Sequence, residues 1–454
     1  MSERFIASLD LGTSKMILSV AKVCGENIEP IFSRRFPSDG LQYGKVVNPK
    51  RAADSIRKAV SEAESELDIK LGSVCVTLPR FDVRQVLSTG EHNRPSPEQY
   101  IIEEDLHFLR DVAINSYGSL NKESEEIYEA VAQSYTTEDL FQASEDMITG
   151  STGAKIEGNF KLFIGKKNAS DNIERAATEA GLSVFGKYFA PLVSAKCVLS
   201  SAEMDNGVAL MEIGAGVSSV AIFTDGILRH YGAIPFGGRN VTIDIKNECD
   251  LTEALAENIK LAYGACLPEK LQNMSEKILV ISNEEDGSSR KVPVKRISEI
   301  ADCRMREIFE ALLYITQDSG LMGKMRSGIV LIGGGASLTN AANLLREMSG
   351  MNVRIGYPKP KGISLNDHPV LQNTDSSESI GLILESATIK GLDSSREKEV
   401  DTTPGDGSLF GKLNEKKPRP RKQVLGNVGR KVENDLGNTI GSLWDTFVNP
   451  ENNK

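Results

Sequence analysis

The chain has 454 residues, of which 40% are apolar and 26% are charged, a composition typical of a globular protein with two or three domains. Its net charge of −10 disfavours a role in binding nucleic acid. We expect a cytoplasmic protein that does not span a membrane, because we find no apolar signal region and no apolar run of about 18 residues. The six cysteines have no paired spacing, which favours free thiols in a reducing compartment.

The first informative stretch, residues 5–23, has the alternating pattern of two strands joined by a tight turn. Gly12 in this turn lets the backbone approach a ligand, and successive N–H groups there can bind an anion. Asp10 precedes the turn, where a carboxylate can hold a hydrated cation. The turn also supplies hydroxyls and a positive charge, from Thr13, Ser14 and Lys15. Taken alone, the stretch fits an ordinary hairpin with a polar tip better than it fits a ligand-binding turn.

The next part of the chain has the pattern of an α/β domain that contains an insertion. A third strand, an amphipathic helix and a further strand are predicted at 28–32, 49–67 and 72–77. Residues 82–166 are polar and acidic, and we interpret them as an inserted subdomain, either a surface elaboration or an interaction module. Two helices are predicted after it, at 168–180 and 190–203.

Residues 208–223 repeat the pattern of the first stretch. Glu212 and Gly214 occupy the places of Asp10 and Gly12, and a third strand follows at 227–234. Two such meanders indicate a duplicated domain with a cleft between the halves. Two glycine turns that face each other across a cleft could hold a polyphosphate from both sides.

A mostly helical segment is predicted at 239–263, after a pair of glycines. Glu257 and Lys260 lie on one face of it. They form either a surface ion pair of little energetic value or a pair that holds the sugar of a nucleotide. Two strands within 277–294 and a long helix at 295–319 follow.

The third informative stretch is residues 328–345, where a strand leads into Gly333, Gly334 and Gly335. A helix is predicted directly after it, with Ser337 as its N-cap. Glycines between a strand and a helix favour a bound phosphate or a flat nucleoside. A short strand and a closing helix are expected at 353–355 and 379–388.

The composition of residues 391–423 predicts a disordered linker, basic toward its end. An amphipathic helix is predicted at 424–448, and a helix with Trp and Phe on its apolar face after a basic run suits a membrane surface. The alternative is docking on the body or on another chain. The apolar residues that we expect to enter the membrane are Val428, Val432, Leu436, Ile440, Leu443, Trp444 and Phe447.

The three glycine segments, in this order, resemble those of the actin-like ATPase superfamily. The resemblance implies an α/β fold of duplicated, ribonuclease-H-like domains around a nucleotide cleft, with ATP and Mg²⁺ as ligands. It also implies that Asp10 and Glu212 act in catalysis and hold the metal through water. The implied nucleotide-binding residues are Gly12, Thr13, Ser14, Lys15, Gly214, Ala215, Gly216, Glu257, Lys260, Gly333, Gly334 and Gly335.

Within that superfamily the chain is most similar to the FtsA family of bacterial cell-division proteins, because of its opening stretch, the place of its insertion and its C-terminal helix. This family implies actin-like polymers on the cytoplasmic side of the cell membrane at the division septum, held there peripherally by the terminal helix. It also implies binding of the C-terminal tail of the tubulin-like protein FtsZ to residues 241–315, and contact with later division proteins.

The family also implies a division of the chain into subdomains. The first actin-like subdomain would comprise 1–81 and 167–203 with the insertion at 82–166, the second would comprise 204–240 and 316–390, and a smaller one would occupy 241–315.

The second phosphate motif departs from the family pattern Asp-x-Gly-Gly-Gly-Thr. Glu212 is one methylene longer than aspartate, and Val217 replaces the threonine hydroxyl. Because a displaced carboxylate shifts the metal or water that it orients, we expect ATP binding with slow or negligible turnover. A sugar-kinase-type phosphotransferase of the same superfamily is the alternative. A dinucleotide-dependent oxidoreductase is disfavoured, since a strand rather than a helix is predicted after Gly216.

Overall fold

The computed structural model describes residues 3–396 except 272–275, 283–288, 366 and 390. The predicted helix at 424–448, with all its expected membrane-facing residues, lies outside the described residues, as does the linker from 397 onward. Among the described helices, none is long and apolar enough to cross a membrane.

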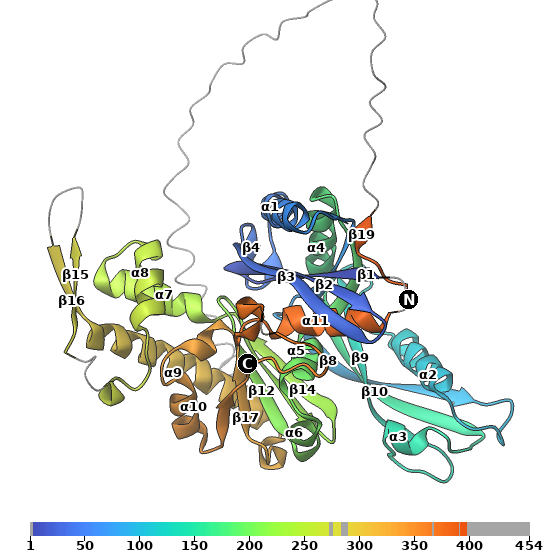
Figure 1. The fold of residues 1–454 in the computed structure, drawn as a ribbon. Helices are drawn as coiled ribbons and strands as arrows, with labels where there is room; N and C mark the ends of the chain where they lie inside the picture. The colour runs from blue at the N-terminus through green and yellow to red at the C-terminus, as the bar shows by residue number, and fades with distance from the viewer. Residues whose placement is uncertain (1–2, 272–275, 283–288, 366, 390, 397–454) are drawn as a thin grey trace, which may run out of the picture. The chain divides into compact units, whose positions relative to one another are not determined.

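The first five-stranded sheet has the order β11-β7-β1-β2-β3, and Figure 1 shows β1, β2 and β3 of this sheet. The three strands of the predicted meander are antiparallel, and β1 and β11 each pair in parallel with β7. The strands are β1 (Arg4–Leu11), β2 (Lys15–Cys24), β3 (Asn27–Pro37), β7 (Ser73–Leu78) and β11 (Ser183–Phe189). Two small hairpin strands, β4 (Leu41–Gln42) and β5 (Lys45–Val46), and the short β6 (Lys70–Leu71) accompany them.

The two faces of this sheet bury different side chains because alternate residues of a strand point to opposite faces. Leu9 and Leu18 pack against helices α1 (Pro49–Leu67) and α4 (Lys167–Glu179). Ser8 and Ser19 point to the other face, where their hydroxyls meet that of Ser379 on α11 (Ser377–Thr388). The small serines thus let a helix lie close to the sheet.

The second five-stranded sheet has the order β14-β13-β12-β17-β18, which is the order and connectivity of the first sheet. The strands are β12 (Val208–Ile213), β13 (Ser218–Thr224), β14 (Ile227–Ile234), β17 (Ile329–Ile332) and β18 (Val353–Ile355). Helices α7 (Gly238–Cys249), α8 (Glu253–Tyr263), α9 (Val294–Asp318) and α10 (Ala341–Ser349), and the hairpin β15 (Ile278–Ser282) and β16 (Ser289–Pro293), complete this half. The duplication predicted from the two meanders is confirmed.

Helices α5 (Ala190–Val198) and α11 join the two halves. Their crossing is close because Gly381 has no side chain, and a Cβ there would lie 2.2 Å from the Val193 carbonyl oxygen. Val198 and Ile380 pack in the core of the second sheet, whereas Leu382 packs against Cys75 of the first. The two sheets therefore share one pair of helices.

Residues 84–166 form a separate three-stranded antiparallel sheet of order β8-β10-β9, covered by helices. Its elements are β8 (Arg84–Asn93), β9 (Glu125–Thr136), β10 (Lys155–Lys166), α2 (Glu103–Ser116) and α3 (Glu145–Ile148). The segment has its own apolar core, which includes Leu109 and Phe160.

Two predicted helices are broken in the structure. The segment at 190–203 stops at Leu199, which is extended, and α6 (Ser201–Asn206) starts anew because Ser200 and Glu203 form a capping box. The segment at 239–263 divides at Asp250, whose φ of +51° ends α7, and Thr252 caps α8. The predicted N-cap role of Ser337 is also wrong, since Ser337 lies in a 3₁₀ turn and α10 starts only after Asn340.

The first residues of the predicted linker, 391–396, pack on the first half instead. The short strand β19 (Ser395–Arg396) pairs with β6, and Leu392 is buried. The Ser394 hydroxyl accepts a hydrogen bond from the Ala7 amide (3.0 Å), and the Ser394 amide donates to the Phe5 carbonyl (2.7 Å). The polar residues that suggested disorder serve here to satisfy backbone groups of the central strand β1 and of β6.

We predict that Leu392→Ala lowers the free energy of unfolding by about 2–4 kcal/mol, because it leaves a cavity beside Cys75 and Leu382. Denaturant unfolding of the full chain measures this loss. The control Val47→Ala, at a side chain that is 56% exposed, should change it by less than about 0.5 kcal/mol. Equal effects of the two substitutions would contradict the packing of residues 391–396.

Candidate functional site

The informative residues of both halves lie at the carboxyl ends of parallel strands, where open α/β sheets place their ligands. In the first sheet, the pairing of β1 with β7 sets Asp10 near Thr77 and the following Arg80. In the second sheet, Glu212 is paired with Ile332, directly before Gly333. The duplicated topology therefore brings these ends into one region.

The two glycine turns that the sequence singled out meet. A Cβ atom on Gly216 would lie 3.0 Å from the side chain of Thr13, so the turns approach to van der Waals contact. Thr13 is held by its hydroxyl, which accepts a hydrogen bond from the Gly44 amide (2.8 Å). A small cavity opens between the halves at this point, and its lining includes Gly12, Thr13, Arg80, Gly214, Ala215, Gly216 and Glu378.

Of the two carboxylates behind the turns, Asp10 is buried, with 9% of its surface exposed, and the side chain of Glu212 is 12% exposed. Burial raises the pKa of Asp10 to about 7, and the Glu212 and Asp375 carboxylates add to this rise, while Arg80 and Lys15 oppose it. Burial also raises the pKa of Glu212, against the opposing effect of Arg80.

Arg80 pairs with two carboxylates, one on β12 and one on α11. Its Nη1 lies 2.6 Å from Glu212 Oε1, and its Nη2 pairs with the carboxylate of Glu378 on α11. The Thr77 hydroxyl donates to the other Glu378 oxygen (3.2 Å). The Arg80–Glu212 pair therefore joins the first half to the second.

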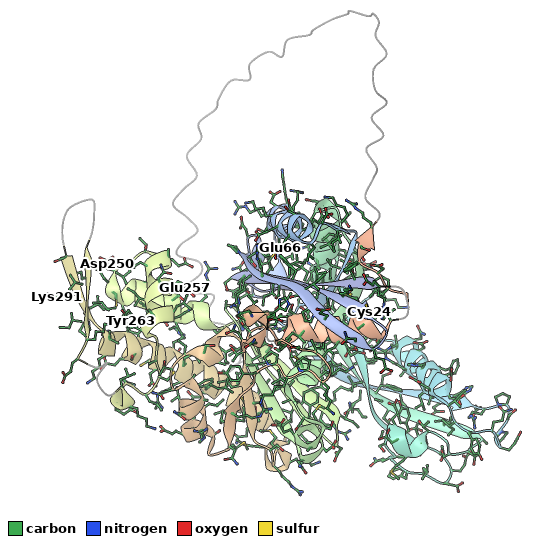
Figure 2. All side chains as sticks on the ribbon, viewed as in Figure 1. Cys24, Glu66, Asp250, Glu257, Tyr263 and Lys291 are labelled. Atoms are coloured by element: carbon green, nitrogen blue, oxygen red, sulfur yellow. The ribbon has the colours of Figure 1, made fainter. Side chains whose placement is uncertain are left out.

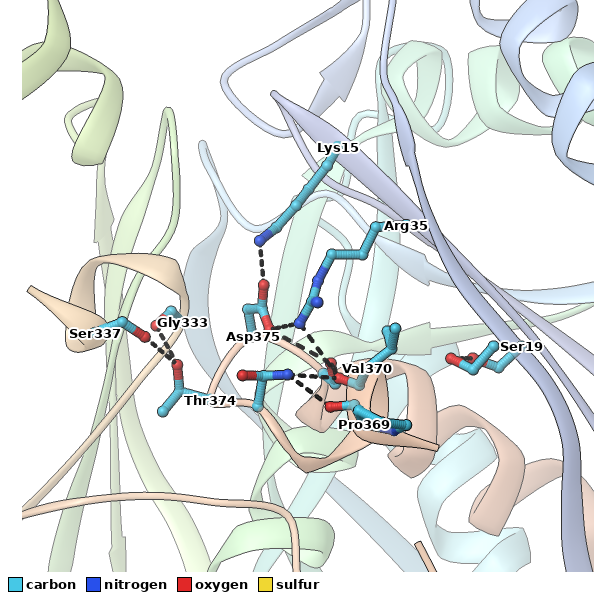
Figure 3. A network of polar contacts seen from close by, with 12 residues as sticks. Lys15, Ser19, Arg35, Gly333, Ser337, Pro369, Val370, Thr374 and Asp375 are labelled. Atoms are coloured by element: carbon cyan, nitrogen blue, oxygen red, sulfur yellow. Dashed lines mark hydrogen bonds and ion pairs between the residues drawn. The ribbon is translucent and has the colours of Figure 1, made fainter. Parts of the chain in front are cut away.

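Lys15, predicted to contact a phosphate, pairs with the carboxylate of Asp375, as does Arg35 at 2.7 Å (Figure 3). Burial alone would raise the pKa of Asp375, but Lys15 and Arg35 outweigh it and lower this pKa. The neighbouring Thr374 hydroxyl donates to the Gly333 carbonyl (2.8 Å). Residues 374 and 375 thus connect the first turn to the third glycine segment.

The three consecutive glycines have different surroundings. At Gly333, where φ is +86°, a Cβ would lie 2.5 Å from the Ile213 carbonyl oxygen, and at Gly335 it would lie 2.3 Å from the Ile213 side chain. At Gly334 nothing lies within 4 Å. Gly333 and Gly335 are therefore needed for packing against β12, and Gly334 presents open backbone to a flat ligand.

The interpretation of Glu257 and Lys260 as a simple surface ion pair is wrong. Lys260 is buried, and its amine donates to Glu257 (2.8 Å), the Thr242 hydroxyl (2.9 Å) and the Gly238 carbonyl (3.0 Å). These bonds occupy the three donors of the ammonium group. Glu257 lies on α8 with 41% of its side chain exposed (Figure 2). Lys260 is thus a positioning residue, and Glu257 is the member of the pair that can reach a ligand.

The arrangement fits a magnesium nucleotide. The open turn backbones offer N–H groups for phosphates, and Gly334 and Glu257 offer a place for a nucleoside. The described residues contain no cluster of three or more His, Cys, Asp or Glu side chains that could hold a metal by themselves. A hydrated Mg²⁺ usually takes one or two carboxylates together with water and phosphate oxygens. Asp10 and Glu212 are the carboxylates available for that role.

Arg80, Glu378 and Asp375 were missed by the sequence reasoning. Arg80 follows a fully buried strand by two residues, and a charge at such a place is a usable signal. Glu378 is the acidic residue in the first turn of α11, yet only 2% of it is exposed. Asp375 offered no signal, because its partners Lys15 and Arg35 are more than three hundred residues away in sequence.

Comparison with known proteins decides the family. A family model described as "Cell division protein FtsA" matches residues 209–380. The cell division protein FtsA of Pseudomonas aeruginosa is 31% identical over 389 residues, which are 84% of this chain and 89% of that protein. This chain belongs to the FtsA family. The FtsA protein of Neisseria meningitidis is 29% identical, over 90% of this chain and 97% of its own length.

Solved structures agree on the fold. A PilM–PilN type IV pilus biogenesis complex contains a chain with a TM-score of 0.57 and 17% identity, covering 84% of this chain and 98% of that one. MreB5 of Spiroplasma citri bound to ADP gives a TM-score of 0.50 and 13% identity, covering 84% and 95%. The fold is actin-like, as predicted, and FtsA membership leaves the sugar-kinase alternative without support. The oxidoreductase reading is also excluded by the strand β13 that follows Gly216.

We predict that, in the ligand-free FtsA-family protein, Asp10→Asn makes the free energy of unfolding fall less steeply as pH rises from about 4 to about 7. The pKa of Asp10 is raised from 3.8 to about 7, so the native state binds more protons in this window and loses stability as pH rises through it. Thermal unfolding between these pH values measures the slope, and an unchanged slope in the variant would contradict the prediction.

Glu203→Gln provides a control of opposite sign. Burial raises the pKa of Glu203, but Arg354 and Ser200 outweigh it and lower it to about 2. The stability that Glu203 contributes is present above its unfolded pKa of 4.5 and is lost as pH falls toward 2. This substitution should therefore leave the slope between pH 5 and pH 7 unchanged.

Proposed function

We propose that this FtsA-family protein binds ATP with Mg²⁺ in the cleft between its halves and tethers the FtsZ ring to the cytoplasmic side of the cell membrane. One observation supports the nucleotide site above all. The glycine turns of two copies of the same sheet touch at Thr13 and Gly216, with the buried Asp10 behind one and Glu212, 12% exposed, behind the other. A related fold in the comparisons, that of MreB5 of Spiroplasma citri, was solved with ADP bound.

The roles follow from the surroundings of each residue. The N–H groups of residues 12–15, Ala215 and Gly216 bind phosphates, whereas that of Gly214 donates to the Val217 carbonyl within the turn (2.9 Å). Gly334 faces the base, and Glu257 holds the sugar. Asp10 and Glu212 orient the waters of a bound Mg²⁺. The metal supplies charge neutralisation to the phosphates when it is bound.

Turnover is slow in this proposal for the reason that the sequence already contained. Glu212 is one methylene longer than the aspartate of the family pattern, so the metal or the water that it orients is displaced. In the ligand-free protein the Glu212 carboxylate is also paired with Arg80 at 2.6 Å.

We predict that the purified full chain binds Mg·ATP, as measured by calorimetry, and hydrolyses it slowly or negligibly. Glu212→Asp, which restores the carboxylate length of the family pattern, should raise the turnover measured by phosphate release. Ser349→Ala, on the half-buried end of α10, is a control that should leave binding and turnover unchanged. Rapid hydrolysis by the unmodified chain would contradict the assigned role of Glu212.

The tethering part of the proposal rests on family membership and on the sequence of residues 424–448. The terminal helix lies on the membrane surface, the body assembles into actin-like filaments, and residues 241–315 bind the FtsZ tail. Later division proteins are recruited to the same assembly. The protein is thus peripheral and located at the septum.

We predict that Trp444→Asp releases the protein from vesicles of phosphatidylglycerol and phosphatidylethanolamine, because it places a charge in the apolar face of the helix. Co-sedimentation measures the bound fraction. Asn434→Asp adds the same charge to the predicted polar face and should retain most of the binding. Equal loss in both variants would indicate bulk electrostatics, and no loss in either would remove the anchor.

A further inference from the structure

Arg80 places a cation inside the cavity between the two glycine turns. It lines this cavity together with residues of both turns, and its Nη1 lies 3.9 Å from the position of a Cβ on Gly214. Its side chain is 18% exposed, so it is neither a surface residue nor sealed in the core. Neither Gly334 nor Glu257 is part of the cavity lining. The guanidinium therefore lies at the phosphate end of the site, away from the nucleoside.

The backbone of Arg80 is held in place, whereas the carboxylates that its guanidinium binds could be replaced by another anion. The Tyr231 hydroxyl donates to the Arg80 carbonyl (2.7 Å), which ties this loop to the second sheet. The guanidinium holds two carboxylates, Glu212 and Glu378, at separate nitrogen atoms. A phosphate presents the same geometry and more charge, and arginine binds both groups through paired N–H donors.

Glu378 has the features of a resting partner for Arg80. Its side chain is 3% exposed, and the Thr77 hydroxyl keeps a hydrogen bond to it that does not depend on Arg80. No metal or catalytic role is assigned to Glu378. A buried carboxylate that lines a cavity weakens the binding of an anion there unless a cation neutralises it, and Arg80 is the cation that pairs with Glu378.

We propose that Arg80 binds the terminal phosphate of the nucleotide and leaves Glu212 and Glu378 to do so. Arg80 thereby discriminates a nucleoside triphosphate from a diphosphate, and the ion pair between the two halves opens only when the third phosphate is present. This inference rests on the proposed nucleotide binding.

A double-mutant cycle in the full chain tests it, with dissociation constants for Mg·ATP and Mg·ADP measured by calorimetry. Arg80→Met should weaken ATP binding about tenfold or more, as expected for the loss of a paired charge-assisted contact, and should change ADP binding little. Glu378→Gln should strengthen ATP binding, because it removes the competitor for Arg80. In the Arg80→Met background, Glu378→Gln should have no such effect.

A purely structural ion pair gives different results. Both single substitutions would then destabilise the protein, and the ratio of ATP to ADP affinity would stay constant. An unchanged ratio in Arg80→Met overturns the inference, as does an equal effect of Glu378→Gln in both backgrounds, since the carboxylate would then act by direct repulsion. Arg80→Lys keeps the charge without the fork and should give an intermediate ratio.

Folding and the proposed function are controlled separately. The double variant removes one positive and one negative charge, so its comparison with Glu378→Gln isolates Arg80 even if Arg80→Met alone fails to fold. If the unmodified chain binds both nucleotides and the Arg80 variants keep its affinity ratio, only this inference fails. If the unmodified chain binds neither nucleotide, the proposed function fails and this inference fails with it.

Discussion

The contact between the two glycine turns is the constraint on which the rest of this structure depends. Thr13 and Gly216 can touch only because Gly216 has no side chain, and a Cβ there would already press on Thr13. The contact fixes the distance between the two sheets at the end where their central strands stop. Everything that the site can bind must fit between backbones held at this separation.

Charge is arranged around that contact in a way that balances locally. Asp10, Glu212 and Glu378 approach from three elements, and Arg80 lies among them. Lys15 and Arg35 neutralise Asp375 at the edge of the same region. Buried carboxylates of this density persist only with such partners, because each unpaired one would lose its hydration without compensation. A triphosphate that enters this region must therefore compete with the protein carboxylates for these cationic side chains.

The shared helices α5 and α11 pack against both halves. Ser379 touches the first sheet, Ile380 lies in the core of the second, and Gly381 allows the helices to cross. Glu378 lies three residues before Gly381 and lines the cavity. Because Glu378 lies on α11, a change in the partner of Arg80 would alter a contact of the helix that both sheets share.

The sequence by itself determined the duplicated sheets, the three glycine segments and the family. Alternating apolar residues on either side of a glycine are local patterns, and local patterns are set by backbone sterics and burial that each short stretch carries with it. The helix breaks at Leu199 and Asp250 were harder to predict from the sequence, because the apolar stripe continues across both. The packing of residues 391–396 could not be predicted either. These residues are polar, like those of a linker, and their partner strand β6 is far away in sequence.

Only the tertiary structure decided the partners of the charges. Arg80 and Glu378 are nearly three hundred residues apart, and no periodicity links them. Lys260 looked like half of a surface pair until the fold placed Gly238 and Thr242 against its amine. Which ion faces which is decided by the crossing of strands and helices from distant parts of the chain, and a one-dimensional pattern does not contain that geometry.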